Sequence, residues 1–209
     1  MPRLVRPLLL AASLLPGAAH AADLPTPLGL HGFNLGMTLV EVRGQKFPGP
    51  AATKARLICS GDNLSNAEEI ELLPGEALRT IGVKACRFFA VEAGAKHKAP
   101  LKVAGRDAEV TFLATPKSDD PATSERLYLI VAKAEPAHYE EFVRAYTAQL
   151  GRANVRIGRY RLWQDARVSL FIGDEPGQSS SVVYLDKALS QKAEPPAEDK
   201  AKSDEKKLQ

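Results

Sequence analysis

Hydrophobic and polar positions alternate in several short runs of this 209-residue chain, and such alternation predicts half-buried β-strands. The clearest stretch runs from Arg126 to Ile172, where a strand-like run is followed by a helical pattern and then by two strands around residues 164–166. The predicted strands are residues 55–59, 82–91, 101–103, 109–113, 126–132, 158–163, 167–172 and 181–185. Because several of them are separated only by turn-length connections, we expect antiparallel hairpins.

One long helix is predicted between residues 135 and 150. Its apolar side chains recur at steps of three and four, which places them on one helix face. They are Tyr139, Phe142, Val143, Tyr146 and Leu150. Pro136 is tolerated in the first turn, and Gly151 is a natural end for the helix.

A second, short helix is predicted after Thr38. Thr38 and Glu41 match the S/T-x-x-E capping box, in which each residue satisfies a free N–H of the first helical turn. Met37 and Val42 occupy the two positions of a hydrophobic staple, and Gly44 marks the end of the helix.

These elements predict an α+β fold, with an antiparallel sheet and helices packed on one face. Each half of the chain reads as a helix followed by strands, so two tandem repeats are a further prediction. We expect a single domain over residues 22–189. Residues 190–209 combine Lys with acidic residues and contain no aromatic residue, and this composition predicts a disordered, charged tail.

The first 21 residues predict a cleaved signal peptide and therefore export to the periplasm or the medium. Arg3 and Arg6 precede a short apolar run, and Ala19 and Ala21 supply the small residues of a cleavage site. The apolar run is about half the ~20 residues that a membrane-spanning helix needs, and no later segment is long enough, so no transmembrane segment is expected. With no Cys near the cleavage site, no lipid anchor is expected either.

The two cysteines, Cys59 and Cys86, both follow the signal peptide and lie in strand-like runs. An even number of cysteines in an exported chain predicts a disulfide bond. Such a bridge would contribute about 3.5 kcal/mol by restricting the unfolded chain. Two buried free thiols are the alternative. The chain has no C-x-x-C motif, so a redox-active pair is not expected.

No catalytic, cofactor-binding or metal-binding residue is predicted. The chain contains no phosphate-binding glycine motif and no G-x-S-x-G nucleophile motif, and its histidines lack metal-ligand spacing. His138 and Glu141 are three residues apart at the start of the long helix, so an enzyme with a dispersed acid/His site is the alternative. Removal of Arg3 and Arg6 lowers the formal net charge from +3 to +1, which gives little attraction for nucleic acid.

One basic and aromatic cluster stands out in the second hairpin. Its residues are Arg156, Arg159, Arg161, Trp163 and Arg167. On a strand, Arg159, Arg161 and Trp163 share one face. Three interpretations remain open: a solvated outer sheet face, a protein-interaction face, or a site for an anionic envelope ligand.

The run GFNLGMTLVEV, the helix HYEEFVRAYTAQLG, the strand with Trp163 and the closing strand VVYLD resemble small exported bacterial proteins of unknown function. Their order is similar to that of the BLIP-like and SmpA/OmlA modules, although SmpA/OmlA proteins are lipoproteins and this chain lacks the lipidated Cys. The resemblance implies a helix-plus-antiparallel-sheet architecture, a periplasmic location and a non-catalytic role. We therefore expect an exported binding or accessory protein with a protein partner in the cell envelope.

Overall fold

A computed structural model of the chain describes residues 24–49, 55–62, 76–92, 95–175 and 177–193. Ten strands form one antiparallel sheet, in which the order β3-β4-β7-β8-β12-β11-β10-β9 is extended by β5 beside β4 and β6 beside β7. Two further strands, β1 and β2, form a separate hairpin. The strands are β1 (Gly29–Leu30), β2 (Phe33–Asn34), β3 (Ala55–Cys59), β4 (Lys84–Glu92), β5 (Ala95–Lys98), β6 (Leu101–Val103), β7 (Arg106–Ala114), β8 (Leu127–Ala134), β9 (Val155–Ile157), β10 (Tyr160–Gln164), β11 (Val168–Glu175) and β12 (Ser179–Asp186). The predicted α+β class with an antiparallel sheet is confirmed.

The helices of the described residues are short except for one. They are α1 (Leu39–Gly44), α3 (Glu76–Thr80), the 3-10 turn η1 (Pro136–His138), α4 (Tyr139–Leu150) and α5 (Lys187–Lys192). The capping box of α1 is present: the Thr38 N–H donates to the Glu41 carboxylate at 2.7 Å, and the Glu41 N–H donates to the Thr38 hydroxyl at 3.2 Å. Helix α4 ends at Gly151, whose φ of 77° suits glycine.

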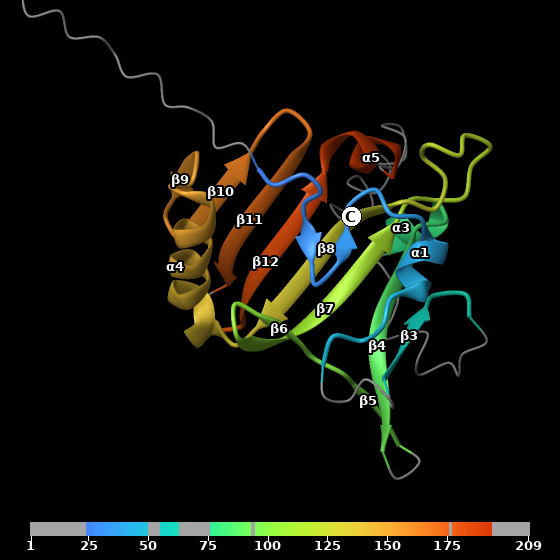
Figure 1. Cartoon of the computed structure of the whole chain (residues 1–209), viewed down its shortest axis with the longest axis horizontal. Coiled ribbons are helices and arrows are strands. Elements are labelled where there is room, and N and C mark those ends of the chain that lie inside the picture. Colours follow the sequence, from blue (N-terminus) through green and yellow to red (C-terminus); the bar gives the residue numbers. More distant parts are fainter. Residues whose placement is uncertain (1–23, 50–54, 63–75, 93–94, 176, 194–209) are drawn as a thin grey trace, which may run out of the picture.

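The two faces of the sheet carry separate apolar cores. On β8, Ile130 and Ala132 belong to the larger core, whereas Leu129 and Val131 point to the smaller one, as the two-residue period of a strand requires. Helix α4 covers the larger core over β11 and β12, and the β1–β2 hairpin lies on the same face (Figure 1). Leu189 of α5 packs into the smaller core. The prediction that the helices pack on one face is therefore not confirmed, and the tandem repeats stay a prediction.

Two differences from the predicted elements concern residues 95–98 and the start of the tail. Residues 95–98 lie outside the predicted strands, but they form β5, which pairs with β4 and keeps polar side chains at a sheet edge. The expected start of the tail at residue 190 falls inside α5, whose cap Asp186 accepts from the Leu189 N–H at 2.9 Å. Ala193, buried in the smaller core, is the last described residue, so residues 194–209 of the predicted tail and the signal peptide lie outside the described part.

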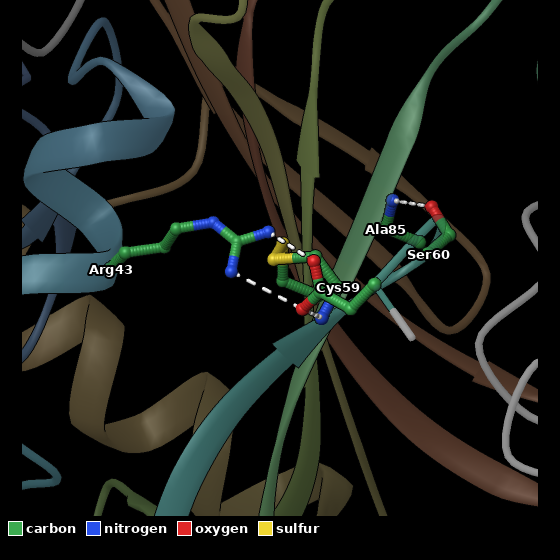
Figure 2. The surroundings of a disulfide bond; sticks show 6 residues. Arg43, Cys59, Ser60 and Ala85 are labelled. Atoms are coloured by element: carbon green, nitrogen blue, oxygen red, sulfur yellow. Dashed lines mark hydrogen bonds and ion pairs between the residues drawn. A yellow bond between two sulfur atoms is a disulfide. The ribbon is translucent and has the colours of Figure 1, made fainter. Parts of the chain in front are cut away.

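Cys59 and Cys86 form a disulfide bond between the neighbouring strands β3 and β4, where they are directly opposite each other. The residues around the bond are tied together as well. The Ala85 N–H donates to the Ser60 hydroxyl at 3.0 Å, and Arg43 of α1 reaches across to this corner (Figure 2). Arg43 there forms an ion pair of 2.7 Å with Asp62. The bond therefore closes β3 onto the sheet, as the cysteine pattern predicted.

Candidate functional site

The basic and aromatic residues singled out by the sequence lie at the β9 end of the sheet. Strand β10 pairs with β11 on one side and with β9 on the other, and Arg161 lies opposite Arg156. Gly158 makes the tight turn between β9 and β10 with a φ of 52°. The turn is short, so Ile157 and Tyr160 also become direct partners across the two strands. The structure thus brings Arg156, Arg159 and Arg161 together at one corner.

Trp163 is not part of this surface, and its predicted membership of an interaction face is wrong. The side chain is fully buried, and its strand position opposite Leu170 directs it into the larger core near Tyr146 of α4. Its Nε1–H donates to the Gly151 carbonyl at the end of α4, at 2.9 Å. A buried indole needs such an acceptor, and α4 supplies it. Trp163 therefore joins β10 to α4.

Arg159 is also engaged within the fold, although it is half exposed. Its Nε forms an ion pair with Asp174 Oδ2 at 2.5 Å, and its guanidinium lies 4.5 Å from the centre of the Tyr139 ring. The Asp174 side chain is only 4% exposed, so Arg159 supplies the positive charge that a buried carboxylate requires. The second Asp174 oxygen and the Tyr139 hydroxyl are buried without a hydrogen-bond partner among the described residues.

Arg161 and Arg167 bind polar groups of the chain itself. Arg161 Nη1 donates to the carbonyl oxygens of Gly158 at 2.7 Å and Tyr160 at 2.9 Å, and so holds the β9–β10 turn. The Arg167 guanidinium donates to the Thr26 hydroxyl and ties the N-terminal segment to the β10–β11 turn. These contacts favour a structural role for both side chains.

The exposed residues at this corner are fewer than those of the predicted face, and some of them were not predicted. Ile157 is 67% exposed and Tyr160 is 46% exposed, the latter with its ring stacked on Phe171. Arg156 is exposed, and no ion pair holds it within the part of the chain that the structure describes. The outer edge of β9 pairs with no described strand. We call this set the β9 surface: Arg156, Ile157, Tyr160 and the outer edge of β9.

Sequence reasoning missed Ile157 because β9 is only three residues long and its alternation is too brief to predict a strand. A usable signal was still present. Val155 and Ile157 flank Arg156 immediately before the turn glycine Gly158, which is the pattern of a short hairpin arm. Tyr160 was visible in the sequence as an aromatic residue among arginines, but only its exposure shows that it belongs to the surface.

His138, at the end of η1, and Glu141, in the first turn of α4, lie close together, but Arg106 binds the Glu141 carboxylate. Arg106 of β7 donates to both carboxylate oxygens, at 2.5 and 2.7 Å, and these hydrogen bonds lower the pKa of the Glu141 carboxyl. His138 Nδ1 lies 3.4 Å from the same carboxylate, and His138 Nε2 lies 3.9 Å from Glu135. The cluster joins β7 to the start of α4. Within the described ranges, no group of three His, Cys, Asp or Glu residues is placed to hold a metal ion.

No family model, no curated protein and no solved structure matches this chain. Among the helices in the described part of the chain, none is long and apolar enough to cross a membrane.

Proposed function

We propose that this chain is an exported, non-enzymatic binding or accessory protein of the bacterial cell envelope, and that a protein partner binds at the β9 surface. The β9 surface carries this proposal, because the exposed Ile157 and Tyr160 on one face of the hairpin and the exposed Arg156 on the other flank a free strand edge. The disulfide between β3 and β4 is compatible with an oxidising compartment outside the cytoplasm. The N-terminal signal-like segment supports export.

The strand edge indicates how the partner binds. An extended segment of the partner can pair with the free edge of β9 and so add a strand to the sheet. Main-chain hydrogen bonds then supply affinity, while Ile157 and Tyr160 provide apolar contacts beside the new strand. A single three-residue strand is a small contact, so the apolar pair and the charge have to contribute to specificity.

The charge of this corner favours an acidic partner segment. Arg152, Arg156 and Arg161 lie within or next to β9 and β10. The nearby carboxylates are already occupied: Asp174 pairs with Arg159, and Asp165 accepts from the backbone N–H groups of its own turn. The excess positive charge attracts acidic groups and repels a second copy of the same surface.

An anionic envelope ligand, such as a lipid headgroup, is the second candidate, and the same excess of arginines favours it. The exposed Ile157 and Tyr160 favour a protein instead, since aromatic and apolar side chains beside arginine are typical of protein interfaces. An enzymatic role has less support, because Arg106 already donates hydrogen bonds to both carboxylate oxygens of Glu141. The resemblance to BLIP-like and SmpA/OmlA modules supports an inhibitor-like or assembly-partner role.

Site-specific crosslinking tests the proposal. A photoreactive residue replaces Ile157 in the full chain, expressed with its own N-terminal segment. The matched control carries the same residue in place of Val40, which is 78% exposed on α1. We expect an envelope protein to be captured at position 157 and not at 40, and Arg156→Glu to reduce the capture at least tenfold. Equal capture at both positions, or capture unaffected by Arg156→Glu, contradicts binding at the β9 surface.

Export is tested separately on the unmodified chain. Mass spectrometry of the periplasmic fraction should show a protein without residues 1–21 and lighter by two hydrogens than the reduced form. A full-length protein with two alkylatable thiols in the cytoplasm would contradict the location, whatever the crosslinking shows.

A further inference from the structure

A cleft of about 340 Å³ opens on the α4 side of the sheet, away from the β9 surface. The β1–β2 hairpin and the β6–β7 turn form two of its sides, and the C-terminal half of α4 forms a third. Leu170 of β11 and Tyr184 of β12 contribute to it from the sheet, and Tyr146 contributes from α4. Its volume lies within the range of small-molecule sites.

The hairpin that borders the cleft is held in place by contacts with two other strands and by a hydrogen bond that closes its own ends. The His31 Nε2–H donates to the Lys102 carbonyl of β6 at 2.5 Å. The Gly36 N–H donates to the Leu127 carbonyl of β8 at 2.8 Å, and the Leu35 N–H donates to the Leu28 carbonyl at 2.9 Å. Leu28 and Leu30 are buried in the larger core. The cleft is therefore preformed, as ligand sites usually are.

Two buried tyrosine hydroxyls meet at the cleft, and together they have one hydrogen more than their contacts use. The hydroxyls of Tyr146 and Tyr184 are hydrogen-bonded to each other. Each hydroxyl carries one donor hydrogen, but only one of the two hydrogens can lie in the shared bond. The other finds no acceptor among the described residues. An acceptor oxygen of a ligand in the cleft can take up this hydrogen bond.

The protonation of the pair does not remove this donor at neutral pH. Burial raises the pKa of Tyr146, and burial raises the pKa of Tyr184 well above its ordinary value. Both tyrosines therefore keep their hydrogens.

The other polar groups around the cleft are mostly uncharged, which defines the ligand class. Asn34 and Gln149 contribute amide side chains, and Pro25 and Pro27 contribute apolar rings. The one lysine of the lining, Lys102, holds its ammonium 2.9 Å from Asp107. An anionic ligand would find no uncommitted cation among the described lining residues.

We propose that this cleft binds a neutral, oxygen-rich small molecule, whose hydroxyl or amide carbonyl oxygen accepts a hydrogen bond from the Tyr146–Tyr184 pair. Sugars and amides share this chemistry. Its lining shares no residue with the β9 surface.

Titration by NMR spectroscopy with three neutral probes tests the site: glucose, N-acetylglucosamine, and N-acetylalanine methylamide. Glucose offers hydroxyl oxygens, the alanine derivative offers amide carbonyls, and N-acetylglucosamine offers both. We expect at least one probe to bind with a Kd in the millimolar range, and to shift the backbone amide signals of Gln149 and Leu170. Absence of binding by all three, or shifts confined to other parts of the protein, overturns the proposal.

The double variant Tyr146→Phe/Tyr184→Phe removes both hydroxyls, so that no single hydroxyl is left without its partner. It should weaken probe binding about tenfold, because a hydrogen bond to the ligand is lost. Tyr128→Phe is the matched control, since Tyr128 is buried in the smaller core on the opposite face, and it should leave the Kd unchanged. Unchanged binding by the double variant overturns the role of the hydroxyl pair. If the double variant does not fold, the signal shifts in the unmodified protein decide the question.

Discussion

The two ends of the sheet are held by different means. At one end, β3 pairs with β4 over five residues, and the Cys59–Cys86 bond closes the last of these pairs covalently. At the other end, β9 pairs with β10 over three residues, and the turn between them is fixed by Arg159 and Arg161. The disulfide holds β3 permanently against β4. Reversible side-chain contacts leave the β9 end able to adapt to an added strand.

Removal of the disulfide should cause the largest loss of stability. For Cys59→Ala/Cys86→Ala we expect the free energy of unfolding to fall by about 3.5 kcal/mol, because the unfolded chain regains the freedom of a 27-residue loop. Urea denaturation measures the change. Reduction of the unmodified protein is the control and should give a similar loss. A loss below about 1 kcal/mol would show that the β3 end is held mainly by its hydrogen bonds and apolar contacts.

Loss of the Arg159 side chain should have the next largest effect. Arg159→Ala leaves the Asp174 carboxylate buried without its counter-charge, and we expect the free energy of unfolding to fall by about 2 kcal/mol. Arg156→Ala, in the same hairpin but exposed, is the matched control and should change it by less than about 0.5 kcal/mol.

The double variant Arg159→Ala/Asp174→Ala sharpens this result. It should be more stable than Arg159→Ala alone, because no buried charge is left unpaired. If both variants unfold at the same urea concentration, the ion pair does not hold the β9 end, and the backbone pairing with β10 is sufficient.

Protonation of Asp62 in acid should lower the free energy of unfolding, by less than removal of the disulfide or of the Arg159 side chain. Burial by itself raises the pKa of Asp62, but hydrogen bonds from the Arg43 guanidinium and the Cys59 N–H outweigh it, so the pKa lies below its ordinary value. A carboxyl group of this kind stabilises the fold above its unfolded pKa of about 3.9, and the contribution is lost as the pH falls through the lower, folded pKa.

Asp62→Asn should therefore cost about 1 kcal/mol at neutral pH, and the difference from the unmodified protein should shrink as the pH falls below about 3.9. Thermal unfolding across this pH range measures it. Asp119→Asn, in an exposed loop, is the control and should behave as the unmodified protein at every pH. A difference that persists unchanged in acid would rule out the charge of Asp62 as the cause.

Local patterns predicted local structure well in this chain. The capping box at Thr38, the hairpin that joins residues 101–103 to residues 109–113 and the hairpin around residues 164–166 depend on residues that are close in sequence, and all are present. The disulfide followed from two cysteines in strand-like runs. Trp163 was misplaced for the opposite reason, since its burial depends on α4, which packs over β11 and β12 and whose position no local pattern specifies.

Which residues are exposed could not be predicted from local patterns either. Alternation in the sequence shows which residues share a sheet face, but not which face a helix covers. The position of α5 on the smaller core, and the exposure of Ile157 and Tyr160, both follow from the long-range order of the strands. That order also brings Tyr146 and Tyr184 together from segments 38 residues apart.

The position of β12 between β8 and β11 has a consequence for how the chain matures. Synthesis proceeds from the N-terminus, so β8 is made well before the strand that completes its second edge. Until residues 179–186 have been made, β8 and β11 each lack the same neighbour. A product of premature termination that lacks β12 would present both strand edges at once, and unpaired edges template aggregation.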